Sequence, residues 1–289
     1  MLFDLRSPGR RRFIKVIYSM LALLMGGGLI FFGIGSDATG GLSELFTGSS
    51  GNGESGFEDQ IDDANAKLET NSQDTVALAE LVQLHYQAGN TQLDIDEETQ
   101  QQIFTTEAAE EYAQSADAWD RYVKLSGPKA DPSTALLAVQ NFSALAQAEF
   151  QKAGTGSGQQ ALSDADDSLA NWKAAAEAQQ VVTNDKGDAD SYAGLAALYY
   201  LAGEFEQADQ AKQQALGAAK GGDNSSIEEE LAATEKQARE LTTAIEQFRK
   251  QLASVNQGAG APGGATGGEN PLSGLGGGGL SGGGGLSTP

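Results

Sequence analysis

The sequence predicts an all-α protein that carries a hydrophobic segment near its N-terminus. Ala, Gln, Leu and Glu dominate the middle of the chain, and β-branched residues are few there. Apolar residues recur in the same region at intervals of three and four, which is the period of an α-helix. Residues 16–36 contain no charged side chain over the length that a helix needs to cross a bilayer.

The chain begins with a basic segment, residues 1–15, followed by a predicted transmembrane helix at residues 16–36. At about 1.5 Å per residue such a helix spans the roughly 30 Å hydrocarbon core of a bilayer. Positions that represent this span are Val16, Leu24, Gly28 and Phe32. Basic residues precede the span and Asp37 follows it, so the positive-inside bias places the N-terminus in the cytoplasm. We therefore expect a single-pass protein of a bacterial plasma membrane with its C-terminal domain extracytoplasmic.

The same N-terminal stretch has an alternative interpretation as a cleaved export signal. "RRRFIK" fits the twin-arginine pattern, and small residues around Ala38 have the spacing that a signal peptidase uses. Cleavage there would release a soluble secreted protein. Hydrophobic regions of signal peptides usually have 7–15 residues, and this uncharged run is longer, which favours a retained anchor.

Low-complexity segments bound the helical part of the chain. Residues 37–56 are rich in Gly, Ser and Thr and are predicted to be a flexible tether between membrane and domain. Residues 257–289 form a Gly-rich tail whose composition cannot build a core, so we expect it to be disordered. The helical domain between them covers residues 57–222.

Residues 187–216, "GDADSYAGLAALYYLAGEFEQADQAKQQAL", show an internal pattern of large, small and turn-forming residues. The residues that form this pattern are Tyr192, Leu195, Tyr199, Gly203, Phe205, Ala208 and Ala215. The pattern resembles a tetratricopeptide (TPR) repeat, a 34-residue helical hairpin. Lys212 departs from it, because an aromatic residue is usual at that position.

Two fainter copies begin at Asp74 and Asp131, and the clear copy begins at Asp188, 57 residues further on each time. The long interval predicts inserts between the two helices of a hairpin, at residues 90–104 and 154–168. Apolar positions expected in the core are Leu78, Leu81, Val82, His85, Leu136, Val139, Ala146, Leu195, Leu198 and Tyr199. The resemblance implies a TPR-like array of about three helical hairpins that binds a protein or peptide; an ordinary helical bundle is the alternative.

Residues 223–256 are predicted to form one long helix with a heptad pattern. Ser226 and Glu229 have capping-box spacing at its start. The seam consists of Ile227, Leu231, Thr234, Ala238, Leu241, Ile245, Phe248, Leu252 and Val255. This seam can cover the end of the array or pair residues 226–255 in a homo-oligomer. Glu230 and Glu235 would face each other in a parallel dimer, and their repulsion favours covering.

The residues of a catalytic or metal site are not legible in the sequence. The chain has no cysteine and a single histidine, His85, which is predicted to pack between helices. Acidic clusters at 94–98 and 164–167 lack the calcium-loop spacing and are interpreted as solvated loop charge. The net charge of −22 disfavours nucleic acid. The sequence therefore predicts no cofactor, no enzyme activity and a scaffold or assembly adaptor for an unknown protein ligand.

Overall fold

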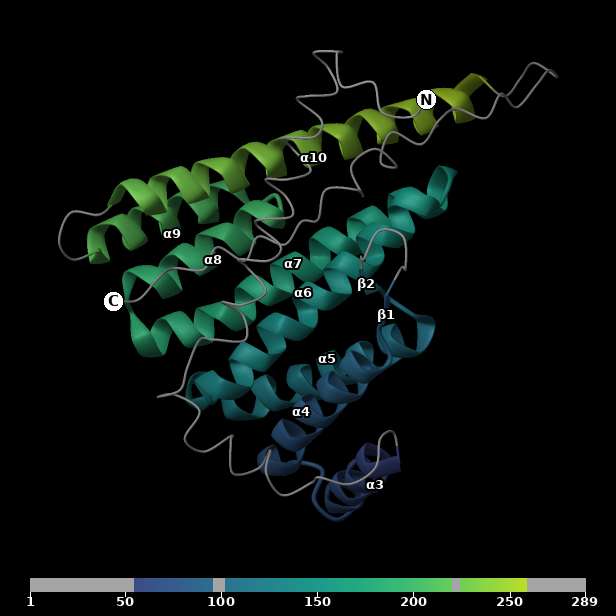
Figure 1. Ribbon diagram of the computed structural model, residues 1–289, viewed down its shortest axis with the longest axis vertical. Coiled ribbons are helices and arrows are strands. Elements are labelled where there is room, and N and C mark those ends of the chain that lie inside the picture. The colour runs from purple at the N-terminus through teal and green to yellow at the C-terminus, as the bar shows by residue number, and fades with distance from the viewer. Residues whose placement is uncertain (1–54, 96–101, 220–223, 259–289) are drawn as a thin grey trace, which may run out of the picture. The chain divides into compact units, whose positions relative to one another are not determined.

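The computed structural model of the chain describes residues 55–95, 102–219 and 224–258, and within them the chain is predominantly helical (Figure 1). The prediction of an all-α fold is confirmed. The helices are α3 (Ser55–Thr70), α4 (Thr75–Thr91), α5 (Thr106–Ser126), α6 (Pro132–Thr155), α7 (Gly158–Lys186), α8 (Ala189–Leu201), α9 (Phe205–Ala218) and α10 (Asn224–Gly258). The remaining elements are a 3-10 helix, η1 (Gly127–Lys129), and an antiparallel pair of two-residue strands, β1 (Asp94–Ile95) and β2 (Gln102–Ile103).

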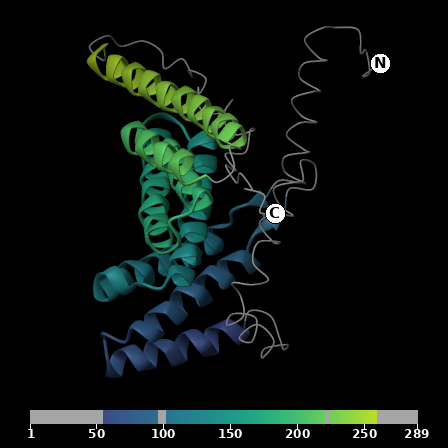
Figure 2. The ribbon, with the colours of Figure 1, turned by 90° about the vertical axis from the view of Figure 1, so that its left-hand side faces the viewer.

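Successive helices pack as three hairpins, α4 with α5, α6 with α7, and α8 with α9 (Figure 2). We call α4, α6 and α8 the first helices and α5, α7 and α9 the second helices. Each hairpin also contacts the next one, since α6 packs on both α4 and α5, and α8 packs on α7. All the described residues belong to one compact unit.

The three first helices begin with the same local structure, an aspartate at the N-cap. Asp74 accepts hydrogen bonds from the backbone N–H groups of Val76 and Ala77, Asp131 from that of Thr134, and Asp188 from that of Ser191. An N-cap of this kind stabilises a helix by about 1 kcal/mol, because it satisfies a backbone donor that has no partner inside the helix. The 57-residue interval in the sequence is therefore also the interval between equivalent helix starts.

The predicted insert at residues 154–168 is wrong. α6 continues to Thr155 and α7 starts at Gly158, so only two residues connect them. Ala161, Leu162 and Ala165 are buried, and this packing holds the segment in a helix that local glycine content alone disfavours. The other predicted insert, residues 90–104, lies largely between α4 and α5 and contains β1 and β2.

Buried polar side chains join the helices by donating to backbone carbonyls. Ser115 Oγ on α5 donates to the carbonyl of Val82 at 2.8 Å, and Ser168 Oγ on α7 donates to that of Ala146 at 2.7 Å. Both bonds connect a second helix to the first helix of its own hairpin. Because each hydroxyl is buried with its donor satisfied, it avoids the desolvation cost of an unpaired polar group.

Buried amides connect neighbouring hairpins in a similar way. Asn141 Nδ2 on α6 donates to the carbonyl of Tyr112 at 2.8 Å, and Gln179 Nε2 on α7 donates to that of Ser191 at 3.2 Å. These bonds fix the stagger of one hairpin against the next. A hydrophobic interface alone tolerates sliding more easily, because its attraction is not directional.

Tyr112 fills the centre of the first hairpin and is fully buried. Its ring lies against Gly89 of α4, so closely that a Cβ atom on Gly89 would be 2.7 Å from Tyr112 Cε1. The Tyr112 hydroxyl donates to Asn90 Oδ1 at 3.0 Å, which fixes the ring in place. Burial raises the pKa of Tyr112 well above its ordinary value.

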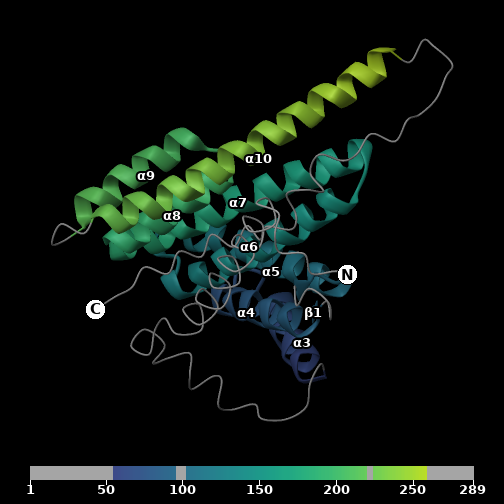
Figure 3. The same cartoon turned by 45° about the horizontal axis from the view of Figure 1, so that its top comes forward.

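α10 packs along α8 and also contacts α9 and α7 (Figure 3). Among the side chains of α10 that the structure describes, up to residue 254, the buried ones are Ile227, Leu231, Ala238, Leu241, Ile245 and Phe248, all members of the predicted heptad seam. Two arginines of α10 make contacts at the edges of this interface. The Arg239 guanidinium lies 4.2 Å from the centre of the Phe205 ring, and Arg249 pairs with Asp166 of α7 at 2.6 Å. The helix begins at Asn224, so Ser226 lies in its first turn and is not the cap.

The opposite end of the array is covered by α3, which packs on α4. Ala64 and Leu68 are its buried residues, and Lys67 pairs with Glu80 of α4 at 2.7 Å. The predicted transmembrane segment, the predicted tether up to residue 54 and the tail beyond Gly258 lie outside the described residues. Among the helices that are described, none combines the length and the apolar character needed to cross a membrane.

Candidate functional site

Within the part of the chain that the structure describes, one side of the first helices α4 and α6 keeps its side chains partly or fully exposed. Four side chains on one side of α4, at helical spacing, are not buried, and Val76 among them is 75% exposed. The equivalent residues of α6 lie 57 positions later, and none of them is buried either. We call this set of eight the first-helix face: Val76, Ala79, Gln83, Gln87, Ser133, Leu136, Gln140 and Ala144.

Leu136 was expected in the core, and the structure corrects this, because its side chain is 44% exposed. Ala146 is buried as predicted, but Ala135 and Ala138 are buried in place of their predicted neighbours Leu136 and Val139. Alanines carry little hydropathy signal, so the spacing of the larger residues indicated the wrong face. Val139, which was also expected in the core, is half-buried for the same reason.

The equivalent face of α8 is covered. Ala193, Ala197 and Leu201, each 57 positions after a member of the first-helix face, are buried. α10 packs along this helix. Burial, and after it the charge of Asp190 on α8, raises the pKa of the Glu230 carboxyl on α10. Among the described residues, α10 therefore covers this face on α8, whereas the equivalent side chains of α4 and α6 stay partly or fully exposed.

Charge distribution distinguishes the first-helix face from the rest of the surface. None of its eight side chains is charged, although the whole chain has 40 acidic residues. The second helix α5 alone exposes Glu107, Glu110, Asp117 and Asp120. The acidic residue nearest to the face on α4 is Glu80, whose charge is paired with Lys67.

The TPR-signature residues of the third hairpin have different environments. Leu195, Ala208 and Ala215 are buried, whereas Tyr192 and Tyr199 are half-buried. Gly203 has a φ of 76°, which a residue with a side chain rarely adopts, and it forms the turn between α8 and α9. Phe205 follows that turn and packs near Tyr200, with ring centres 6.2 Å apart.

His85 lies between α4 and α5, where it is 5% exposed. Its Nδ1 is 2.7 Å from Oε2 of Glu111, so the pair joins the two helices of the first hairpin. No second histidine can lie beside it, because His85 is the only histidine of the chain. This geometry supports a structural role for the pair.

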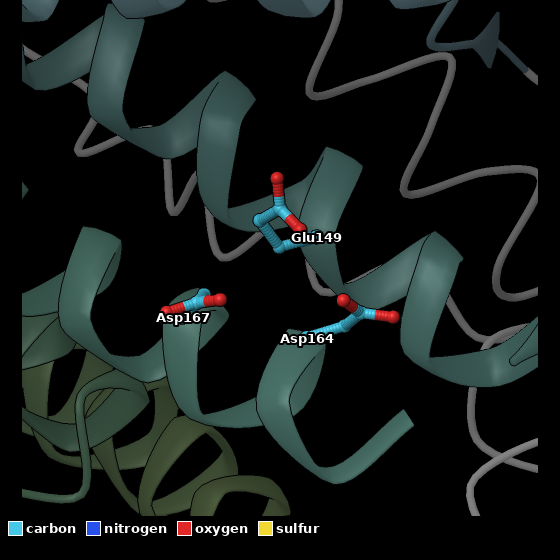
Figure 4. A group of neighbouring side chains, drawn as sticks. All are labelled: Glu149, Asp164 and Asp167. Atoms are coloured by element: carbon cyan, nitrogen blue, oxygen red, sulfur yellow. The ribbon is translucent and has the colours of Figure 1, made fainter. Parts of the chain in front are cut away.

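A cluster of carboxylates lies where α6 meets α7 (Figure 4). Glu149, Asp164 and Asp167 each place an oxygen within 4.8 Å of the others. Glu149 pairs with Lys152 at 2.8 Å, and Asp164 accepts a hydrogen bond from Gln160 Nε2 at 2.7 Å. The sequence interpretation of this region as an exposed loop is wrong, because Asp164 is buried on α7; buried alanines around it fold the segment into a helix.

Comparison with known proteins provides no relative for this chain: no family model, no curated protein and no solved structure matches it.

Proposed function

We propose that this protein is a non-catalytic, membrane-anchored scaffold of the TPR-like type that binds other proteins outside the cytoplasm. The observation that carries the proposal is the first-helix face, an uncovered and uncharged surface on two equivalent helices. Interface centres are depleted of charged residues relative to other protein surface, and this face has that property in a strongly acidic chain.

The hairpin arrangement supports the TPR-like assignment. Three aspartate-capped first helices recur at one interval, and helices cover both ends of the stack. In a repeat array each unit contacts its neighbours, and terminal helices shield the apolar ends from water. In this interpretation α10 is such a terminal helix, and its buried seam supports covering over self-pairing.

The N-terminal segment supplies the anchor in this proposal. Residues 16–36 are long enough and apolar enough to span a bilayer, and the basic residues before them favour a cytoplasmic N-terminus. The alternative function is a secreted binding protein released by cleavage near Ala38. Protease treatment of spheroplasts distinguishes the two, since a retained chain loses the region beyond Gly40 and keeps a protected N-terminal fragment. A mature soluble chain that begins at Thr39 would contradict the anchor.

The binding function is tested by crosslinking in cells. A photoreactive amino acid at Gln140 replaces a member of the first-helix face, and one at Gln213 occupies an exposed position on α9 as the matched control. We expect discrete crosslinked protein bands from Gln140 and none from Gln213. Equal crosslinking from both positions, or none from Gln140, would contradict a binding role for this face.

A further inference from the structure

The partner of the first-helix face can be described more closely from charge, provided that the proposed binding function holds. The face is uncharged, but its surroundings are acidic on several sides. Asp74 and Asp131 stand at the N-terminal ends of α4 and α6, and Asp63 of the adjacent α3 lies near Lys67, the partner of Glu80 on α4. The centre of the surface therefore offers apolar and amide contacts, whereas its margins carry negative charge.

The chain itself shows which kind of element a first helix accepts. α8 is covered by α10, a helix whose Ile, Leu and Phe side chains are buried along one seam. Cationic groups lie at the edges of that interface, where Arg239 stacks on Phe205 and Arg249 pairs with Asp166. An amphipathic helix with arginine or lysine beside its apolar seam is thus the form of occupant found within this structure.

The net charge decides between two external occupants. A second copy of this chain would bring another net charge of −22 against the acidic margins, which disfavours its approach. A cationic partner is attracted by the same field, both during its diffusional encounter and at the margins of the interface. We propose that the first-helix face of α4 and α6 binds a net-basic amphipathic helix of another protein, with Val76 and Leu136 contacting its apolar side.

The test uses the full chain in nanodiscs of zwitterionic phosphatidylcholine, with empty nanodiscs measured in parallel. The probe is a fluorescent 21-residue helical peptide with leucine at three- and four-residue spacing and lysine on its other face. Two comparison peptides keep its length: one has glutamate in place of lysine, and the other has the same composition with the leucine spacing scrambled. Binding is measured by anisotropy at physiological salt, where long-range attraction is partly screened.

Two matched variants distinguish a peptide that contacts the first-helix face from one that is merely attracted to an acidic protein. Leu136→Gln removes an apolar side chain of the face, and Leu125→Gln removes one that is almost equally exposed, 43% against 44%, on α5. We expect the basic periodic peptide to bind best, with Leu136→Gln weakening it about tenfold and Leu125→Gln leaving it within twofold. Circular dichroism of both variants verifies that the helices are retained.

Each of the following results would overturn the proposal. Equal weakening by the two variants, or equal binding of the scrambled peptide, would make the attraction non-specific. Better binding of the glutamate peptide would reverse the assigned charge. Self-association of the parent chain that Leu136→Gln abolishes would assign the face to a second copy. Crosslinking from Gln140 is scored separately, so a positive crosslink without peptide binding refutes the partner chemistry and leaves the binding function standing.

Discussion

Gly89 and Gly194 provide a matched pair of positions for testing how closely the first hairpin is packed. Both glycines lie in first helices, Gly89 in α4 and Gly194 in α8. A Cβ atom on Gly89 would lie 2.7 Å from the Tyr112 ring, whereas one on Gly194 would meet only Gln179 Nε2, at 3.5 Å. The first distance is a steric overlap and the second is an ordinary van der Waals contact.

The expected change in the free energy of unfolding of each variant follows from two opposing effects. Replacing glycine by alanine in a helix interior stabilises it by up to about 1 kcal/mol, and this gain is similar at the two positions. The overlap with Tyr112 costs about 1–3 kcal/mol, because the buried ring must shift from the position in which its hydroxyl donates to Asn90. Gly89→Ala should therefore be less stable than Gly194→Ala by about 1–3 kcal/mol.

The free energies of unfolding are measured by urea titration at 25 °C. Helix content is followed by circular dichroism, and tertiary packing by the fluorescence of Trp119 and Trp172, which are both buried. Coincident transitions in the two signals justify a two-state analysis of each variant. If Gly89→Ala proves as stable as Gly194→Ala, the contact between Tyr112 and Gly89 described above is wrong.

Three further predictions concern the third hairpin and α10. Ala208 is fully buried in α9, so Ala208→Trp should destabilise the chain by about 1–3 kcal/mol in a urea titration, whereas the exposed Glu206→Gln should change little. Burial and then the nearby Asp190 raise the pKa of Glu230, so its ionisation opposes folding above that pKa and the penalty is absent at acidic pH. Glu230→Gln should consequently raise the melting temperature at pH 7 and lose this advantage as the pH falls toward 4. The same gain at both pH values would exclude a cost of ionising Glu230. Ile245 is 2% exposed, so Ile245→Asp should detach or destabilise α10, and a variant that melts like the parent in scanning calorimetry would contradict the burial of the seam.

The sequence located the helical hairpins where local signals agreed with the packing. Asp74, Asp131 and Asp188 are good N-cap residues at a regular interval, and all three are N-caps in the structure. Capping depends on neighbouring residues only, which is why it could be predicted from the chain. The heptad spacing in α10 likewise indicated which of its side chains are buried.

The wrong predictions from the sequence concern segments whose structure depends on packing against residues far away in the chain. The segment around Gly156 has turn-forming residues, but burial of Ala161 and Leu162 extends α7 through most of the predicted insert. The first-helix face was also missed, since the larger apolar residues of α6 suggested that Leu136 was buried. The equal interval between Gln83 and Gln140, and the absence of charge at the positions that share their side of each helix, were signals that could have identified it.

The hydrogen bonds between helices have a consequence for how the hairpins diverge in sequence. Those donated by Ser115, Ser168, Asn141 and Gln179 all end on a backbone carbonyl. Every amino acid carries that acceptor, so a substitution at the accepting position leaves the bond in place provided that the helix keeps its path. Only the donor side chain must be retained for each of these four bonds, so the accepting positions are free to change in sequence while the helices keep their packing.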